Sequence, residues 1–303
     1  MAEQPQWLDP GVLARLTRQF LHARLPMEGN VTGHHKSPHR GSSVEFAEYR
    51  KYVPGDDIRR LDWRVYGKTD RFYMREFEAD TNLRAYMVLD CSGSMGYGSG
   101  ATTKLEYARR LLATLAWLTV QQGDAVGISC FDYHTAIDIP PRRNPAHLRT
   151  ILDSLGQVKP RGETALVGAL HDLAERIRRR ALVIIFSDCF CEVEPLLECF
   201  QHLRFRKHDL AVFHLLDRAE LEFRFDRPVR FVDLETSSSL MAEPAIIRRQ
   251  YLEQLQEHLD RLKTGCSQFH ADYRRITIDQ DYEKVLADFL IERARARVGS
   301  AGV

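Results

Sequence analysis

Residues 85–95, Ala-Tyr-Met-Val-Leu-Asp-Cys-Ser-Gly-Ser-Met, decide the fold of this 303-residue chain. The first five residues are apolar and predict a buried strand, which ends abruptly at Asp90. Ser92 and Ser94 follow, so one carboxylate and two hydroxyls are expected at the end of that strand. Ligands bind at the carboxyl ends of strands in open α/β sheets. Oxygen side chains there suit a hard cation such as Mg²⁺, Mn²⁺ or Ca²⁺ rather than zinc or copper.

Apolar strands alternate with amphipathic helices from about residue 81 onwards. Strands are predicted at residues 85–89, 124–131, 181–186, 210–216 and 273–278. Helices are predicted at residues 145–155, 165–178, 193–203, 245–262 and 282–293, and a further helix is predicted to begin at a cap formed by Thr102 or Thr103. A short hairpin is predicted at residues 223–231. Near-continuous apolar strands joined by helices indicate a mostly parallel sheet with both faces covered. The predicted fold is therefore α/β, a three-layer doubly wound sheet of Rossmann-like type.

The first 80 residues follow a different pattern and are predicted to form a separate N-terminal segment. Asp9 and Pro10 predict the start of a helix, because Asp caps helices and Pro suits their first position. Pro54-Gly55 predicts a turn, and residues 71–77 alternate as a strand does. We therefore divide the chain into a segment at 1–80, a domain at 81–297 and a disordered tail at 298–303.

Composition and charge indicate no nucleic-acid or membrane partner, although local charged patches remain possible. Lys and Arg number 43 and Asp and Glu 42, so the formal net charge of +1 gives no field that attracts nucleic acid or an anionic membrane. No apolar run approaches the length of a membrane span, and the N-terminus lacks the layout of a secretory signal. The six cysteines lie mostly in apolar surroundings and are expected to be reduced core thiols. A cytoplasmic protein is the expectation.

Two later residues complete a set of oxygen ligands. Thr164 precedes the predicted helix at 165–178, and Asp188 follows the predicted strand at 181–186. If the strands are neighbours, two carboxylates and three hydroxyls meet at one edge of the sheet. Two Asp charges neutralise a divalent cation formally, and hydroxyls add no further negative charge. A cation held in this way is expected to accept one more anionic ligand, such as a carboxylate from a partner protein.

The order of these residues resembles that of von Willebrand factor A (vWA) domains. Asp90-Cys91-Ser92-Gly93-Ser94 matches their Asp-x-Ser-x-Ser signature, the MIDAS motif, with Thr164 and Asp188 at the remaining metal-site positions. The resemblance implies that the hydroxyls bind the metal directly and that the Asp residues act directly or through water. One departure is Cys189, which stands after Asp188 where Gly is more common.

The upstream residues resemble a bacterial family of vWA-containing proteins, the domain of unknown function 58 family. The matching positions are Gly41, Glu45-Phe46, Tyr49-Arg50, Tyr52, Pro54-Gly55-Asp56-Asp57, Arg59, Asp62-Trp63, Arg75, Phe77-Glu78, Phe231–Glu235 and Tyr251–His258. This resemblance implies partnership with a MoxR-type AAA+ ATPase, as an adaptor in the assembly or maturation of other proteins. Many members carry membrane spans, and this chain resembles the branch without them.

Simpler interpretations remain beside this one. Asp90, Ser92 and Ser94 could form an ordinary turn that caps a helix, leaving a degenerate scaffold without metal. A metal-dependent phosphoester hydrolase is the alternative from the enzyme class, but it needs a base beside the cation. Neither a nucleophile elbow nor a phosphate-binding loop is complete in the sequence. We therefore predict a protein that is not an enzyme. Histidines 34, 35 and 39 are interpreted as solvated loop residues.

Overall fold

The structure is a computed structural model, and it describes residues 7–25, 35–36, 45–51, 73–78, 80–81, 83–132, 135–163, 165–225, 227–235 and 238–299. The chain divides into two units, one formed by Met1–Leu25 with Arg84–Val303 and the other by Pro26–Leu83. The first unit contains helix α1 (Pro10–Leu16). Asp9 caps the N-terminus of this helix, and its side chain accepts hydrogen bonds from two backbone N–H groups. This confirms the helix start predicted at Asp9 and Pro10.

The smaller unit contains two antiparallel strand pairs. Strand β1 (His35–Lys36) pairs with β4 (Asp80–Thr81). Strand β2 (Glu45–Lys51) pairs with β3 (Tyr73–Glu78), and their register shifts once. Strand β3 confirms the strand predicted from residue 71, with its described part beginning two residues later. The turn predicted at Pro54-Gly55 lies outside the described residues.

A six-stranded sheet in the order β12-β9-β8-β5-β6-β7 forms the centre of the larger unit. Its strands are β5 (Arg84–Asp90), β6 (Ala125–Phe131), β7 (Thr135–Arg142), β8 (Leu182–Ser187), β9 (Asp209–Leu216) and β12 (Asp272–Thr277). All neighbours pair in parallel except β6 and β7. Every residue of β6, β8 and β9 is buried, as expected for a parallel sheet covered on both faces. The prediction of a mixed α/β fold with a mostly parallel sheet is confirmed.

Strand β7 was not predicted from the sequence. Its residues include Pro140 and Pro141, and proline cannot donate a hydrogen bond to a neighbouring strand, so these residues argue against a strand in a sequence. Strand β7 lies at the edge of the sheet, where proline is tolerated because one side of the strand needs no partner. Its register against β6 shifts twice. Position in the sheet, which the sequence does not reveal, explains the difference.

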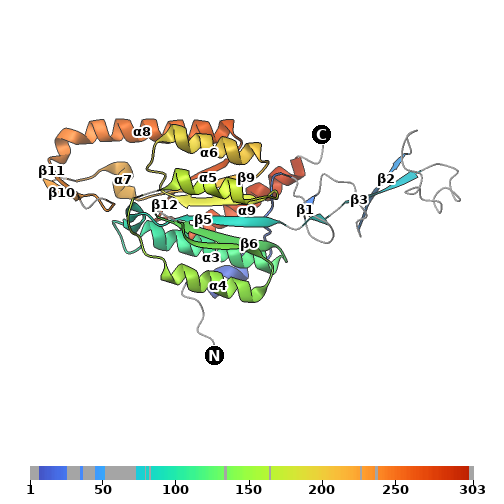
Figure 1. The fold of residues 1–303 in the computed structure, drawn as a ribbon. Coiled ribbons are helices and arrows are strands. Elements are labelled where there is room, and N and C mark those ends of the chain that lie inside the picture. Colours follow the sequence, from blue (N-terminus) through green and yellow to red (C-terminus); the bar gives the residue numbers. More distant parts are fainter. Residues whose placement is uncertain are drawn as a thin grey trace, which may run out of the picture. The chain divides into compact units, whose positions relative to one another are not determined.

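Helices lie on both sides of this sheet (Figure 1). Helices α3 (Lys104–Gln121) and α4 (Pro145–Gln157) occupy one side, and α5 (Leu166–Arg176), α6 (Val193–Phe205) and α8 (Pro244–Gln268) occupy the other. Helix α9 (Tyr282–Gly299) contacts α3. Thr103, one of the two predicted caps, forms a capping box with Glu106 at the start of α3. Within the described ranges, no helix has both the length and the apolar composition to cross a membrane.

The hairpin predicted at residues 223–231 is wrong in position. A short helix, α7 (Arg218–Glu222), ends at Phe223, and the hairpin strands are β10 (Val229–Val232) and β11 (Ser239–Ala242). The Phe223 ring stacks on Phe231 at 5.5 Å and lies 4.5 Å from the ring of Tyr251, measured between centroids. Phe223 and Phe231, the two ends of the predicted hairpin, instead belong to an aromatic cluster between α7, β10 and α8.

Candidate metal centre

Two aspartates lie together at the carboxyl edge of the sheet because their strands are neighbours. Strand β5 ends at Asp90, and Asp188 follows the parallel strand β8. Both side chains are buried, with exposures of 0% and 1%. The Asp90 carboxylate accepts a hydrogen bond from the Ser187 hydroxyl at 2.6 Å and another from the backbone N–H of Ser92 at 2.9 Å. These two donors fix the orientation of the Asp90 carboxylate.

The predicted hydroxyls lie beside Asp90. Ser92 precedes a short 3₁₀ helix, η2 (Gly93–Gly96), which contains Ser94. The Oγ atoms of Ser92 and Ser94 are 3.0 Å apart. Adjacent ligands of an octahedral Mg²⁺ at about 2.1 Å lie about 3 Å from each other. The spacing of these two oxygens therefore fits a hard cation.

The loop before α5 meets the Ser92 loop through its backbone. Gly93 donates a hydrogen bond to the carbonyl of Gly162 at 2.9 Å, and Arg161 donates one to the carbonyl of Cys91 at 3.0 Å. Gly162 has a φ of 67°, a left-handed conformation that glycine adopts without steric cost. Thr164 itself lies outside the described residues, so its role as a ligand stays a prediction.

A buried lysine, which the sequence analysis missed, also belongs to this cluster. The Lys104 ammonium lies 2.7 Å from Asp188 Oδ2 and 2.7 Å from Glu220 Oε1, and its side chain has 0% exposure. It also lies 5.1 Å from the centre of the Phe190 ring, where a cation–π contact adds to its stability. Nothing in the sequence distinguished Lys104 from an exposed residue in the first turn of a helix. Only the packing of α3 and α7 around β8 brings these charges together.

Burial and like charge shape the acid–base properties of the cluster. Burial, and then the negative charge of Asp188, raise the pKa of Asp90 to about 6, although its hydrogen bonds from Ser187 and Ser92 act in the opposite direction. Burial lowers the pKa of Lys104, but the charges of Asp188 and Glu220 outweigh this effect and hold the pKa above its ordinary value. The ammonium therefore stays charged at neutral pH.

The turn of the β10–β11 hairpin packs against the same loop. A Cβ atom on Gly93 would lie 2.1 Å from the carbonyl oxygen of Leu234, so only glycine fits at this position. The hairpin turn that carries Leu234 and Glu235 therefore borders the candidate site. The sequence offered one signal for this contact, since Phe231–Glu235 was among the positions that resemble the family.

Cys189 replaces the glycine that the vWA resemblance leads one to expect after Asp188. Its φ of 52° is a left-handed conformation, which glycine adopts freely and other residues adopt at a cost of about 1 kcal/mol or more. The loop therefore keeps the backbone shape typical of glycine although the side chain differs. The backbone N–H of Cys189 donates to the Ser187 hydroxyl at 2.9 Å, which joins this loop to Asp90.

The donor set of this cluster decides which cations suit it. Asp90, Asp188, Ser92 and Ser94 offer only oxygen, the chemistry of Mg²⁺ and similar ions. Within the part of the chain that the structure describes, no three His, Cys, Asp or Glu residues gather as a metal-binding group. A site here consequently depends on hydroxyl ligands as well as carboxylates.

Comparison with protein families identifies the chain. The profile of the family described as "Protein of unknown function DUF58" matches residues 48–261. The chain belongs to the DUF58 family. Two mycobacterial relatives, "Uncharacterized protein Rv1480" of Mycobacterium tuberculosis (strain ATCC 25618 / H37Rv) and "Uncharacterized protein Mb1516" of Mycobacterium bovis, are each 25% identical to this DUF58 protein over 300 residues. Each alignment covers 95% of this chain and 91% of the relative.

Two solved structures are also similar to this DUF58 protein. The conserved hypothetical protein BatB from Bacteroides thetaiotaomicron has a TM-score of 0.47 and 14% identity. An aerotolerance-related membrane protein from Bacteroides fragilis NCTC 9343 has a TM-score of 0.45 and 14% identity. Each match covers 71% of this chain and 100% of the other chain.

Proposed function

We propose that this DUF58 protein binds other proteins through a divalent cation held in a vWA-like domain. The observation that carries the proposal is the 3.0 Å separation of the Ser92 and Ser94 hydroxyl oxygens next to the buried Asp90. Two neutral hydroxyls at this spacing, on residues that follow a buried carboxylate, suit Mg²⁺, with Mn²⁺ or Ca²⁺ as alternatives. The three-layer arrangement of vWA domains is part of the same proposal and is supported by helices on both sides of the sheet.

Each residue has a distinct role in this proposal. Ser92, Ser94 and Thr164 hold the cation by their hydroxyls, and Asp90 and Asp188 supply negative charge, in part through water. Ser187 holds the Asp90 carboxylate through a 2.6 Å hydrogen bond. Lys104 holds the Asp188 carboxylate in the same way at 2.7 Å. The cation, when bound, supplies a positive centre to which a carboxylate of the partner protein binds.

Partner identity comes from the family resemblance. We propose a MoxR-type AAA+ ATPase as the partner, or a client protein that donates a carboxylate, with this chain acting in the cytoplasm in the assembly or maturation of other proteins. Affinity capture from the native cell in Mg²⁺ tests this directly. The ATPase should be captured by the wild-type chain, and capture should fail with a chelator or with Asp90→Ala. If the partner is captured equally well with the chelator and with Asp90→Ala, a cation-dependent interface is refuted.

Thermal unfolding with added Mg²⁺ tests the cation itself. A ligand that binds only the native state raises the free energy of unfolding by about 2.7 kcal/mol at a hundredfold excess over Kd. This gain should disappear in Asp90→Ala and shrink in Ser94→Ala. Ser154→Ala is the matched control, because Ser154 lies on α4 outside the site. If neither Mg²⁺ nor Mn²⁺ changes the unfolding curve of the wild-type protein or its capture of a partner, the proposal fails.

A metal-dependent phosphoester hydrolase remains the alternative activity. Such an enzyme needs a base beside the cation. Lys104 is engaged in its two ion pairs, and burial lowers the pKa of His214 to about 3 while its Nδ1 lies 2.8 Å from the Tyr273 hydroxyl. Neither group is arranged to activate water. Turnover of a phosphoester that Asp90→Ala abolishes would overturn this assignment.

A further inference from the structure

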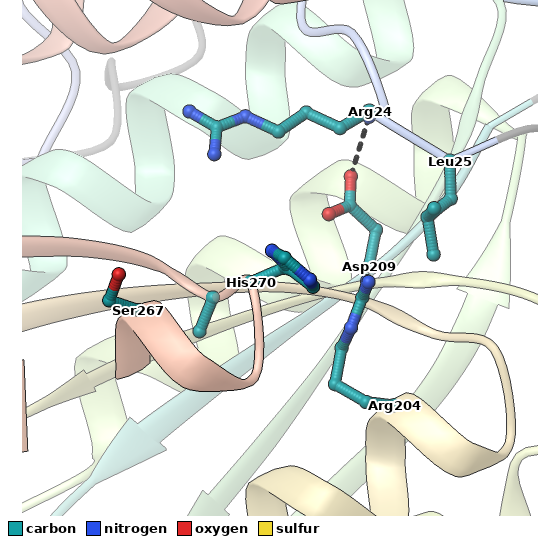
Figure 2. A pocket seen from close by; sticks show the side chains of 7 residues that line it. Arg24, Leu25, Arg204, Asp209, Ser267 and His270 are labelled. Carbon is teal, nitrogen blue, oxygen red and sulfur yellow. Dashed lines mark hydrogen bonds between the residues drawn. The ribbon is translucent and has the colours of Figure 1, made fainter. Parts of the chain in front are cut away.

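A polar pocket lies at the opposite edge of the sheet from Asp90. Strands β9 and β12 begin there, at Asp209 and Asp272, whereas the Asp90 cluster lies where the parallel strands end. The pocket has a volume of about 470 Å³, and its described lining consists of Arg24, Leu25, Arg204, Asp209, Ser267, His270 and Ala271 (Figure 2). This volume falls within the range of about 300–1,000 Å³ that is typical of pockets for small molecules.

One oxygen of the Asp209 carboxylate, in the wall of the pocket, lacks a hydrogen-bond donor among the described residues. The side chain is 1% exposed, and its Oδ2 atom accepts hydrogen bonds from the Arg24 backbone N–H at 2.7 Å and from the Arg293 guanidinium. Its Oδ1 atom is buried and has no hydrogen-bond partner among the described residues. In Figure 2 the second carboxylate oxygen points away from the Arg24 backbone, toward the space around His270. Buried carboxylate oxygens without a donor are costly, so a ligand that donates a hydrogen bond here would be stabilised.

The charges around this acceptor favour an anion. Asp209 and Asp272 are the two carboxylates of the group, and Arg24, Arg204 and Arg293 are its three guanidiniums. Arg24 lies 3.1 Å from Asp272, and Arg293 bridges both carboxylates. The group therefore carries one excess positive charge. Arg274, which also approaches Asp272, is balanced by its ion pair with Glu292 at 2.6 Å and leaves this excess unchanged.

Two guanidiniums have donors left for a ligand. One nitrogen of Arg204 donates to the carbonyl of His208 at 3.1 Å, which leaves its other N–H groups for the pocket. The Nε atom of Arg24 is buried without a partner among the described residues. Guanidiniums suit phosphate because their fork of N–H donors matches its oxygens. The pocket thus presents cationic donors and one anionic acceptor within the same small volume.

We propose that this pocket binds the protonated phosphate group of a small molecule, with Arg24 and Arg204 holding the phosphate oxygens and Asp209 Oδ1 accepting the P–OH hydrogen. A protonated phosphate can use both kinds of group, because its oxygens accept hydrogen bonds from the guanidiniums and its P–OH donates one to the carboxylate. Sulfate has no proton to donate at neutral pH and would place an unprotonated oxygen against the carboxylate. The pocket is larger than a phosphate ion, so it has room for an organic substituent. His270 and Ser267, which line the pocket, would contact this substituent.

Calorimetric titration at pH 6 in a chelating buffer tests the proposal, with inorganic phosphate, AMP, adenosine and sulfate as separate ligands. Near this pH about half of a phosphomonoester carries the proton. Phosphate and AMP should bind, while sulfate at equal ionic strength should bind at least about tenfold more weakly because its contact with Asp209 is repulsive. Tighter binding of AMP than of phosphate would place the substituent in the pocket, and binding of adenosine alone would overturn the assignment to phosphate.

Arg204→Gln should weaken phosphate binding by about tenfold, because it removes a charged donor while the neutral amide preserves much of the side chain's length. Arg206→Gln is the matched control, since Arg206 follows on the same helix end but pairs with Glu175. The Asp90→Ala protein should bind phosphate as the wild type does, which separates this pocket from the proposed cation site. Equal binding of sulfate and phosphate, an unaffected Arg204→Gln variant, or no phosphate binding would each refute the proposal.

Discussion

Replacement of Lys104 by methionine tests the electrostatic design of the candidate metal centre. Methionine has a similar volume but no charge, so the substitution removes the ammonium that lies 2.7 Å from both Asp188 and Glu220. Asp188 is 1% exposed and Glu220 15% exposed, so neither carboxylate regains much solvation. Removal of one partner from a buried ion pair costs about 3–5 kcal/mol. For a domain of this size that loss corresponds to a melting temperature lower by about 6–20 °C.

The same substitution should change the response to Mg²⁺ in the opposite direction. In the wild-type protein the Lys104 ammonium repels a divalent cation near Asp188. Like charges a few ångströms apart at an effective dielectric constant near 20 repel by more than about 1.4 kcal/mol, which is a tenfold change in affinity. The Lys104→Met variant should therefore be less stable without metal but bind Mg²⁺ at least about tenfold more tightly than the wild type.

Thermal unfolding over a series of Mg²⁺ concentrations measures both effects in one experiment. Lys263→Met is the matched control, because Lys263 is exposed on helix α8 and should change neither quantity. If the Lys104→Met protein has the same melting temperature as the Lys263→Met control, the buried ion-pair network is refuted. A destabilised variant with the Mg²⁺ response of the wild type would show that the cation does not bind near Asp188.

Further substitutions test other parts of the reasoning. Gly93→Ala should displace the hairpin turn from the Ser92 loop, because its Cβ would lie 2.1 Å from Leu234 O, and should lower stability by about 1–3 kcal/mol in denaturant unfolding. Thr103→Ala should cost about 1 kcal/mol in the same assay, since it removes the capping box of α3. Burial lowers the pKa of His208 from 6.5 to about 4. As the pH falls from 6.5 to 4, this imidazole is therefore protonated in the unfolded chain but still neutral in the native protein, which favours unfolding. His208 should therefore destabilise the native state across that window, while Asp90, whose pKa is raised to about 6, acts in the opposite direction. The difference between variants isolates His208: His208→Asn, which keeps an acceptor for the Ala181 N–H, should lose less stability than the wild type as the pH falls.

The sequence predicted those features that depend on local pattern. The apolar run before Asp90 predicted strand β5, and the regular alternation after it predicted the parallel sheet. Asp9, and the pair Thr102 or Thr103, predicted helix starts because a cap is a property of neighbouring residues, and Thr103 is the cap in the structure. The strand and the helix starts each required only a few consecutive positions, and the sheet required only the order of such segments along the chain; the structure confirms them.

The features that the sequence did not predict depend on distant contacts. Lys104 acquires its role from Asp188, 84 positions further along the chain, and from Glu220, 116 positions away. No periodicity reports such a pairing. Strand β7 forms because an edge position tolerates Pro140 and Pro141, and Leu234 meets Gly93 only because the hairpin folds back over the loop. Tertiary packing rather than local propensity decides all three.

These contacts also indicate different roles for Asp90 and Asp188 in holding the proposed cation. Asp188 is bonded to a permanent cation, the Lys104 ammonium, and its loop keeps its shape through the left-handed Cys189. Asp90 is oriented by a hydroxyl and a backbone N–H, and it lies next to Ser92 and Ser94. A divalent cation near Asp90 and the two hydroxyls would meet less repulsion than one close to Lys104. We therefore expect Asp90 to lie nearer the cation than Asp188 does, with Asp188 acting through water.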